Sequence, residues 1–156
     1  MTETCEARIA RLGIQIPAAP ALRAAKIRMA RKFGNVLYVS GQLPTIGSEL
    51  GFVGRAGESL DLNQARKAAY HSALNVLAQA RAALPGGLDD VISVINLRGF
   101  VACASHFTQI AEVVNGASEL MVEVFGDAGA HTRSAIGVAS MPHGVAVEIE
   151  AMFEVK

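Results

Sequence analysis

Apolar residues recur at helical spacing in two long segments of the chain. The first follows Asp61, a residue type that caps helices, and continues to Leu84, where Pro85-Gly86-Gly87 ends it. The second runs over Phe107–Phe125 and ends at Gly126. The spacing predicts two amphipathic helices, each with one packed face and one face in water. Their repeating apolar positions are Leu62, Ala65, Ala69, Ala73, Leu77, Ala80 and Leu84, and then Ile110, Val114, Ala117, Met121 and Val124.

Five other segments have the alternation or the β-branched content of strands. The first two are separated by Gly34-Asn35 and predict a β-hairpin. The third is rich in Val and Ile, so we expect a buried strand with few exposed positions. The last two lie on either side of Met141-Pro142-His143-Gly144. The predicted strands are Lys26–Phe33, Val36–Ser40, Asp90–Cys103, Thr132–Ser140 and Val145–Val155, which gives the element order ββαβαββ.

Two further segments lie outside this order. Thr2–Leu12 carries charged residues at helical spacing and predicts a short helix capped by Thr2 or Thr4, within an N-terminal extension of residues 1–22. The glycine-rich stretch 45–60 lacks the Lys-Ser/Thr of a P-loop and the strand-to-helix position of a dinucleotide fingerprint. We therefore expect it to be a surface loop.

This order predicts an α+β fold, a two-layer sandwich in which both long helices pack on one face of a single mixed sheet. Alternation in the last strand places Val147 and every second residue after it under the helices, and Glu148, Glu150, Met152 and Glu154 on the other face. An uncovered sheet face in a chain without net charge favours association. We therefore expect an oligomer that covers this face.

Composition narrows the classes of function. The 156 residues suit one domain, 1–156. The 14 Lys and Arg balance 14 Asp and Glu, and only 5% of residues are aromatic, so a nucleic-acid partner is not expected. No apolar run reaches the ~18 residues of a membrane span, and the N-terminus lacks the pattern of a signal peptide. We expect a cytoplasmic protein with no membrane partner and with Cys5 and Cys103 as free thiols.

Arg133 and Glu148 are the candidate reactive pair. By strand alternation we place Arg133 with the small residues Ala135 and Gly137, while Ile136 points toward the core. If the last two strands are hairpin partners or near neighbours, Glu148 rises from the same face, and both groups point into one hollow. A guanidinium fork binds a substrate carboxylate through two parallel hydrogen bonds. The alternatives are an Arg and a Glu in solvent on an open face, or a structural ion pair.

Other polar residues offer less chemistry. The four histidines, at positions 71, 106, 131 and 143, lack metal-binding spacing, and with two distant cysteines no metal site is expected. His131 projects to the same strand face as Arg133 and is either an acid or base or a hydrogen-bonding residue at an interface. Ser40 and Ser134 lie in no activated-nucleophile motif, so serine-hydrolase chemistry is not expected.

Several of these residues together resemble a known signature. Ser40-Gly41-Gln42-Leu43-Pro44 after an apolar strand, followed by Arg133-Ser134, Pro142 and Val147-Glu148-Ile149-Glu150, resembles the RidA/YjgF family, also called L-PSP endoribonuclease. The segment 129–138 resembles a branch of that family grouped as chorismate-mutase-like by fold. The match covers about Lys26 to Glu150 and keeps the order ββαβαββ.

The resemblance implies a homotrimer with three sites in clefts between subunits, which hydrolyses reactive 2-imino acids and their enamine tautomers to 2-keto acids and ammonia. It implies that Arg133 holds the substrate carboxylate and that Glu148 orients the attacking water. No metal or organic cofactor is implied. The implied substrate-binding positions are Ser40, Gly41, Gln42, Asn115, Ala135 and Ile27, where Ile27 replaces a pocket tyrosine and Ala135 a frequent cysteine.

Three functions follow as hypotheses. The first is the deaminating hydrolase, for which a carboxylate anchor, an oriented water and a proton path suffice. The second is a non-catalytic module that binds or senses a small carboxylate metabolite in the same cleft, and the loss of the aromatic at Ile27 supports it. The third is RNA cleavage, suggested only by a family name, and the zero net charge argues against it.

Overall fold

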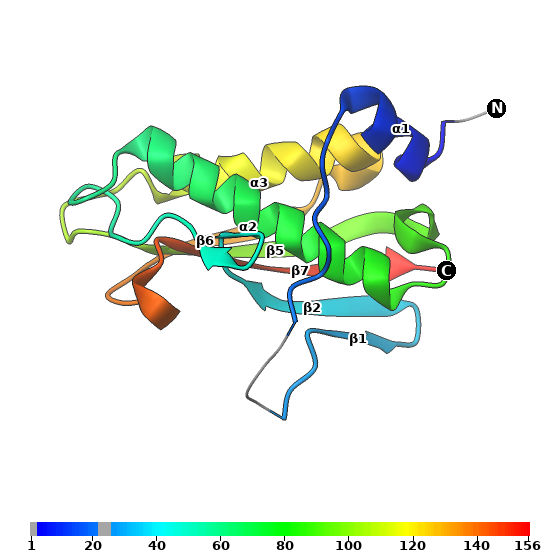
Figure 1. The fold of residues 1–156 in the computed structure, drawn as a ribbon. Coiled ribbons are helices and arrows are strands. Elements are labelled where there is room, and N and C mark those ends of the chain that lie inside the picture. Colours follow the sequence, from blue (N-terminus) through cyan, green and yellow to red (C-terminus); the bar gives the residue numbers. More distant parts are fainter. Residues whose placement is uncertain (1–2, 22–25) are drawn as a thin grey trace.

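A five-stranded sheet with two long helices across one face makes up most of the molecule (Figure 1). The computed structural model describes residues 3–21 and 26–156. The helices are α1 (Cys5–Leu12), α2 (Leu62–Ala83) and α3 (Ile110–Phe125). The strands are β1 (Ala30–Phe33), β2 (Val36–Gln42), β3 (Thr45–Ile46), β4 (Glu49–Leu50), β5 (Val91–Ala102), β6 (Thr132–Val138) and β7 (Val147–Val155).

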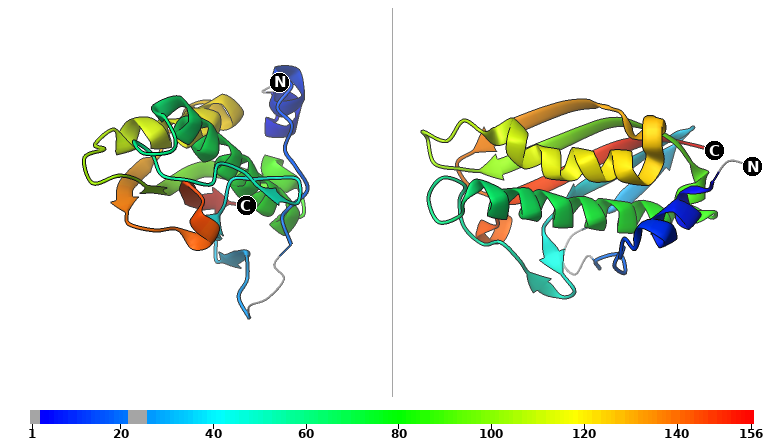
Figure 2. Two further views of the ribbon diagram at one scale, coloured as in Figure 1. Left: turned by 60° about the vertical axis from the view of Figure 1, so that its left-hand side comes forward. Right: turned by 90° about the horizontal axis from the view of Figure 1, so that it is seen from above.

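The sheet has the strand order β1-β2-β7-β5-β6, in which only β5 and β6 are parallel. This confirms the predicted α+β two-layer sandwich with a mixed sheet. Figure 2 shows α2 and α3 side by side over the same face of the sheet. Of the two arrangements that the sequence left open for the last two strands, a hairpin is excluded, because β6 and β7 do not pair. β5 lies between them, since the α3 crossover returns the chain to the outer edge of β5.

Two local differences from the predicted elements concern the N-terminal half. β1 begins at Ala30 rather than Lys26. The glycine-rich stretch 45–60 contains the small hairpin of β3 and β4, which forms a separate two-stranded sheet. The predicted hairpin at Gly34-Asn35 joins β1 and β2.

The core lies between the helices and the sheet. Asp61 caps α2 with a capping box, in which its side chain accepts from the Gln64 N–H and the Gln64 side chain accepts from the Asp61 N–H. A Cβ at Gly116 would collide with the Arg66 carbonyl, so glycine there lets α3 approach α2 closely. The alternate residues of β7 from Val147 to Val155 are buried, as predicted.

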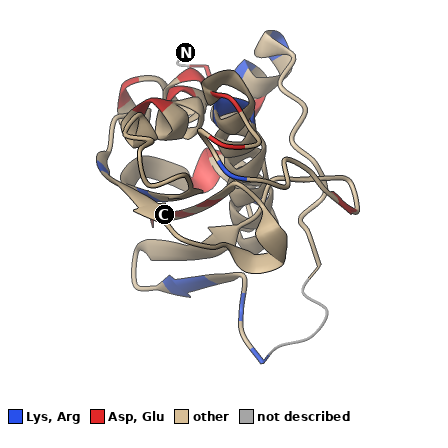
Figure 3. Ribbon diagram, turned by 90° about the vertical axis from the view of Figure 1, so that its left-hand side faces the viewer, with Lys and Arg blue, Asp and Glu red and all other residues tan. Residues whose placement is uncertain are grey.

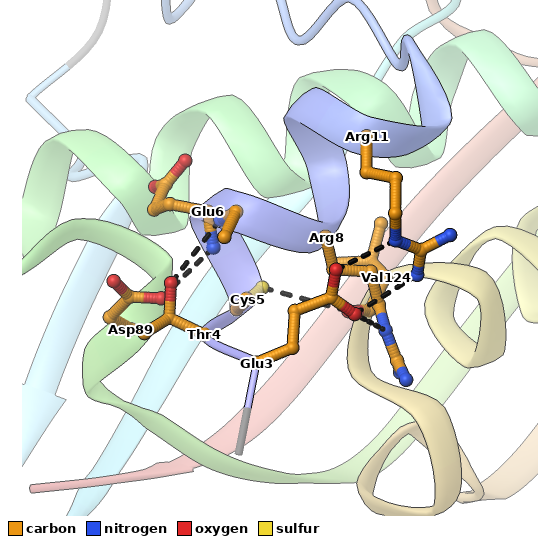
Figure 4. A network of polar contacts seen from close by, with 9 residues as sticks. Glu3, Thr4, Cys5, Glu6, Arg8, Arg11, Asp89 and Val124 are labelled. Atoms are coloured by element: carbon orange, nitrogen blue, oxygen red, sulfur yellow. Dashed lines mark hydrogen bonds and ion pairs between the residues drawn. The ribbon is translucent and has the colours of Figure 1, made fainter. Parts of the chain in front are cut away.

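The N-terminal helix α1 packs at one end of this sandwich (Figure 1), and Figure 4 shows the polar contacts of its residues from close by. Thr4 is its N-cap, and its hydroxyl accepts from the Ala7 N–H, whereas Thr2 lies outside the described residues. Ile9 is buried in the core. The Cys5 thiol donates to the Val124 carbonyl, and burial raises the pKa of this thiol to about 12. Cys5 therefore stays protonated at neutral pH and is a packing residue.

The sheet face opposite the helices carries polar and apolar side chains. Basic residues lie on β1 and on the segment before it (Figure 3). On this face the Phe33 side chain is 77% exposed, and Tyr38 is also exposed to solvent. Across the described ranges of the chain, no helix is both long and apolar enough to span a membrane.

Candidate functional site

The register of the sheet places Arg133 on the side of the helices. Arg133 pairs with Leu97, and Leu97 pairs with Ala151. Side chains of paired residues share one face, and both Leu97 and Ala151 are buried beneath the helices. Arg133 therefore points toward α3, not onto the open face.

The predicted orientation of the whole β6 strand was consequently wrong. Ile136 pairs with Phe100, which pairs with Glu148, so these three side chains lie in one row on the open face. Ile136 is 45% exposed there instead of pointing into the core. The reason is that β6 is an edge strand, where small residues fit under α3 and a large apolar side chain is left outside. Hydrophobicity alone assigns such a strand to the wrong face.

Arg133 lies in a polar cluster between β6 and α3. Its Nη1 donates to Asn115 Oδ1 at 2.7 Å and to Ser118 Oγ at 3.2 Å. Asn115 and Ser118 are three residues apart on α3 and so lie on the same helical face. Ser118 Oγ is 3.0 Å from His131 Nε2, and His131 Nδ1 is 2.6 Å from the Gly129 carbonyl oxygen.

The structure thus brings Asn115 beside Arg133 and adds Ser118, which the sequence did not single out. A sequence signal for Ser118 exists, namely its spacing of three from Asn115 on the helix that precedes β6. Ala135 pairs with Gly99 on the helix side and packs against the core near Arg133.

Glu148 belongs to a second cluster, on the open face where β2 and β7 meet. The register between these strands shifts between Val39 and Gln42, which marks a β-bulge at Ser40 and Gly41. A Cβ at Gly41 would overlap the Glu148 carboxylate, so a larger residue there would displace the Glu148 side chain from this position. Burial raises the pKa of Glu148, and the nearby charge of Glu150 raises it further.

Gln42 supports this bulge from the core. Its side chain is only 2% exposed, and its Nε2 donates to the carbonyl oxygens of Ser40 at 2.9 Å and Gly41 at 3.2 Å. Gln79 donates to its Oε1 at 3.3 Å. The Ser40 N–H donates to the Met29 carbonyl, which ties the bulge to the segment before β1. Gln42 therefore holds the backbone next to Glu148 in place.

Ile27 is the remaining residue among the expected substrate-binding positions. It precedes β1 and is 56% exposed. A hollow of about 350 Å³ lies on the open face of the sheet, opposite the helices. Arg98 and Glu150 form an ion pair of 3.1 Å at the wall of this hollow. The hollow is lined in part by Arg28, Arg31, Tyr38, Ser40, Arg98 and Glu150.

The two clusters do not meet within one copy of the chain. Arg133 and Glu148 point to opposite faces of the sheet, and β5 separates their strands. A structural ion pair between them within one chain is therefore ruled out. Within the described residues, no group of three or more His, Cys, Asp or Glu is placed to hold a metal ion.

Comparisons with known proteins agree with this fold. The endoribonuclease L-PSP family model matches residues 18–155. The Trypanosoma cruzi protein TCP17 is 42% identical over 149 residues, which make up 95% of this chain and 92% of that protein.

Solved structures resemble the chain over nearly its whole length. The Agrobacterium tumefaciens protein Atu1372 is 41% identical with a TM-score of 0.89, over 97% of this chain and 92% of that one. A protein of Shewanella oneidensis MR-1 is 26% identical with a TM-score of 0.91, over 97% and 99% of the two chains. From the family match and these relatives, we conclude that the chain belongs to the endoribonuclease L-PSP family, which is also called the YjgF/RidA family.

Proposed function

We propose that this chain hydrolyses reactive 2-imino acids and their enamine tautomers to 2-keto acids and ammonia. The observation that carries the proposal is the Arg133 cluster, in which a guanidinium is held by neutral side chains of α3. No carboxylate of the described residues forms an ion pair with Arg133. Its positive charge is therefore available to a carboxylate from outside the chain.

The proposed site forms between copies of the chain. Because Arg133 and Glu148 lie on opposite faces, one copy supplies the arginine cluster and a second supplies Gly41 and Glu148. The exposed apolar residues of the open face, Phe33, Tyr38 and Ile136, favour such an association. A homotrimer with three equivalent clefts is the assembly that we propose.

The chemistry needs few groups. Water adds to the carbon of the C=N bond, and the resulting carbinolamine expels ammonia as its hydroxyl group becomes the carbonyl. Arg133 fixes the substrate carboxylate, and Glu148 orients the water and accepts its proton. The raised pKa of Glu148 makes it a stronger base than an exposed glutamate.

Replacement of Arg133 by Lys tests the proposal directly. Lysine keeps the charge but cannot form the two parallel hydrogen bonds, so we expect kcat/KM to fall at least about tenfold. The substrate is 2-iminopropanoate, generated by an amino-acid oxidase, and the readout is pyruvate and ammonia above the uncatalysed rate. Arg66→Lys is the control, because Arg66 also contacts α3 but binds Glu119 outside the cluster. Equal activity of Arg133→Lys and the wild type would refute the assignment.

A non-catalytic binding module is the second candidate, and the exposed Ile27 favours it, because no aromatic side chain closes the cleft at that position. A sensor would be stabilised against heat by a 2-keto acid such as pyruvate without turning over any imine. Turnover of 2-iminopropanoate by the wild type would decide in favour of the hydrolase.

A further inference from the structure

The Arg133 guanidinium is held by one of its three nitrogens. Nη1 carries two hydrogens, and Asn115 Oδ1 and Ser118 Oγ accept from it. For Nε and Nη2, no acceptor is found among residues 3–21 and 26–156. These two nitrogens form one edge of the planar group, and such an edge binds a carboxylate through two parallel hydrogen bonds.

The direction of each hydrogen bond behind Arg133 follows from the chemistry of the groups. The Gly129 carbonyl can only accept, so His131 Nδ1 carries a hydrogen and donates across 2.6 Å. In the neutral imidazole Nε2 is then an acceptor, and it receives the Ser118 hydroxyl hydrogen across 3.0 Å. A lone pair of Ser118 Oγ is thereby left for Arg133 Nη1.

We propose that Ser118 and His131 are positioning residues of the carboxylate site. Together with Asn115 they fix the rotation of the guanidinium, so that the edge formed by Nε and Nη2 faces the substrate carboxylate. His131 acts through Ser118, because it directs the hydroxyl hydrogen away from Arg133. The inference rests on the proposed function, since it assigns the edge of Arg133 that the substrate uses.

Calorimetric titration with pyruvate, a stable carboxylate probe, tests this role in the full-length chain. Ser118→Ala removes the acceptor, and His131→Ala leaves the Ser118 hydroxyl undirected. Each should weaken pyruvate binding about 3- to 10-fold, as expected for the loss of one hydrogen bond. His131→Gln offers Oε1 as an acceptor in place of Nε2 and should restore most of the affinity.

Two further measurements separate positioning from general loss of structure. Pyruvamide has a similar shape without the charge, so its affinity should be the same in the wild type and in each variant. In turnover of 2-iminopropanoate, Ser118→Ala should raise KM and leave kcat near the wild-type value, because the carboxylate is held equally in substrate and transition state. Melting temperatures verify that each variant is folded.

The outcomes distinguish this inference from the proposed function. If Arg133→Lys loses pyruvate affinity but Ser118→Ala and His131→Ala keep it, the positioning role is overturned and the carboxylate site stands. If His131→Gln is as impaired as His131→Ala and both melt earlier, His131 is merely structural and the inference fails. If the wild type does not bind pyruvate, or Arg133→Lys binds it equally well, the carboxylate site and this inference fall together.

Discussion

Glu148 is the residue whose replacement tests mechanism rather than binding. Glu148→Gln keeps the shape over Gly41 but removes the charge and exchanges an acceptor oxygen for a donor group. General-base assistance is worth about 100- to 10,000-fold, so we expect kcat to fall within that range while KM stays nearly constant. Steady-state kinetics with 2-iminopropanoate gives both constants. If Glu148→Gln has the same kcat as the wild type, Glu148 takes no part in the mechanism.

The pH dependence of the wild type supplies a second readout for the same residue. Burial raises the pKa of Glu148, so activity should fall on the acid side at a higher pH than an exposed glutamate would give. For stability, the folded chain keeps this proton to a higher pH than the unfolded chain does. The folding free energy that the protonated Glu148 carboxyl contributes is therefore lost as the pH rises through the pKa of Glu148 in the folded chain. Glu148→Gln should show no such loss, and melting temperatures at a series of pH values would reveal the difference.

Sequence reasoning proposed candidate site residues but placed Arg133 on the wrong face. Arg133 and Glu148 could be selected as candidates because each lies in a short run of consecutive motif residues, Arg133-Ser134 and Val147-Glu148-Ile149-Glu150. The face of Arg133 could not be predicted, because β6 is an edge strand with its large apolar side chain, Ile136, on the open face, so hydrophobicity favours the wrong side. The partnership with Ser118 depends on how closely α3 approaches β6, which strand alternation does not encode.

Among the elements, α1 offers the sharpest test of how a peripheral helix is held. The Glu6 carboxylate accepts from Arg81 Nε at 3.0 Å and Nη2 at 2.6 Å, and from the Leu88 N–H at 3.1 Å. Glu6→Ala leaves these donors without that partner, so the free energy of unfolding should fall by about 1–2 kcal/mol. Urea denaturation measures the change.

Glu3 provides the matched control for Glu6. Glu3 precedes α1, and among the described residues its carboxylate pairs with Arg11 and Arg8 of that helix, which hold the pKa of Glu3 at about 2. Exposed ion pairs contribute little to stability, so Glu3→Ala should leave the urea midpoint almost unchanged. Equal effects of the two substitutions would show that Glu6 does not anchor α1 to the rest of the chain.

The long helices and their caps were predictable, because amphipathic spacing and the Asp61 capping box are local features. The docking of α1 was not, because the contacts of Glu6 join residues more than 70 positions apart. The hairpin of β3 and β4 was also missed, since two-residue strands leave no alternation to detect.

For the whole molecule, the proposed interfacial site requires an oligomer. Light scattering at micromolar concentration should give about three times the chain mass of 16.3 kDa. Ile136→Glu places a charge among the exposed apolar residues of the open face and should shift the distribution toward the monomer. Leu12→Glu, at an exposed apolar position of α1 away from the open face, is the control. A wild-type chain that remains monomeric would refute the interfacial site.

The layer architecture follows from the order of elements, but the strand order does not. Alternation tells which side of β7 is buried, and this was correct. That β7 lies between β2 and β5 depends on pairing between distant segments, which no local pattern specifies.

The central position of β7 has a consequence for how the chain folds. Asn115 and Arg133 are only 18 positions apart, and the unit of β5, α3 and β6 can form from nearby sequence. β2 and β5 do not pair with each other, because β7 lies between them in the sheet. β7 is also the last strand in the sequence. The pair β1-β2 and the pair β5-β6 therefore join into one sheet only when β7 pairs with both β2 and β5. The arginine cluster belongs to the fragment of β5, α3 and β6, whereas the contact between Gly41 of β2 and Glu148 of β7 forms only when β7 pairs with β2.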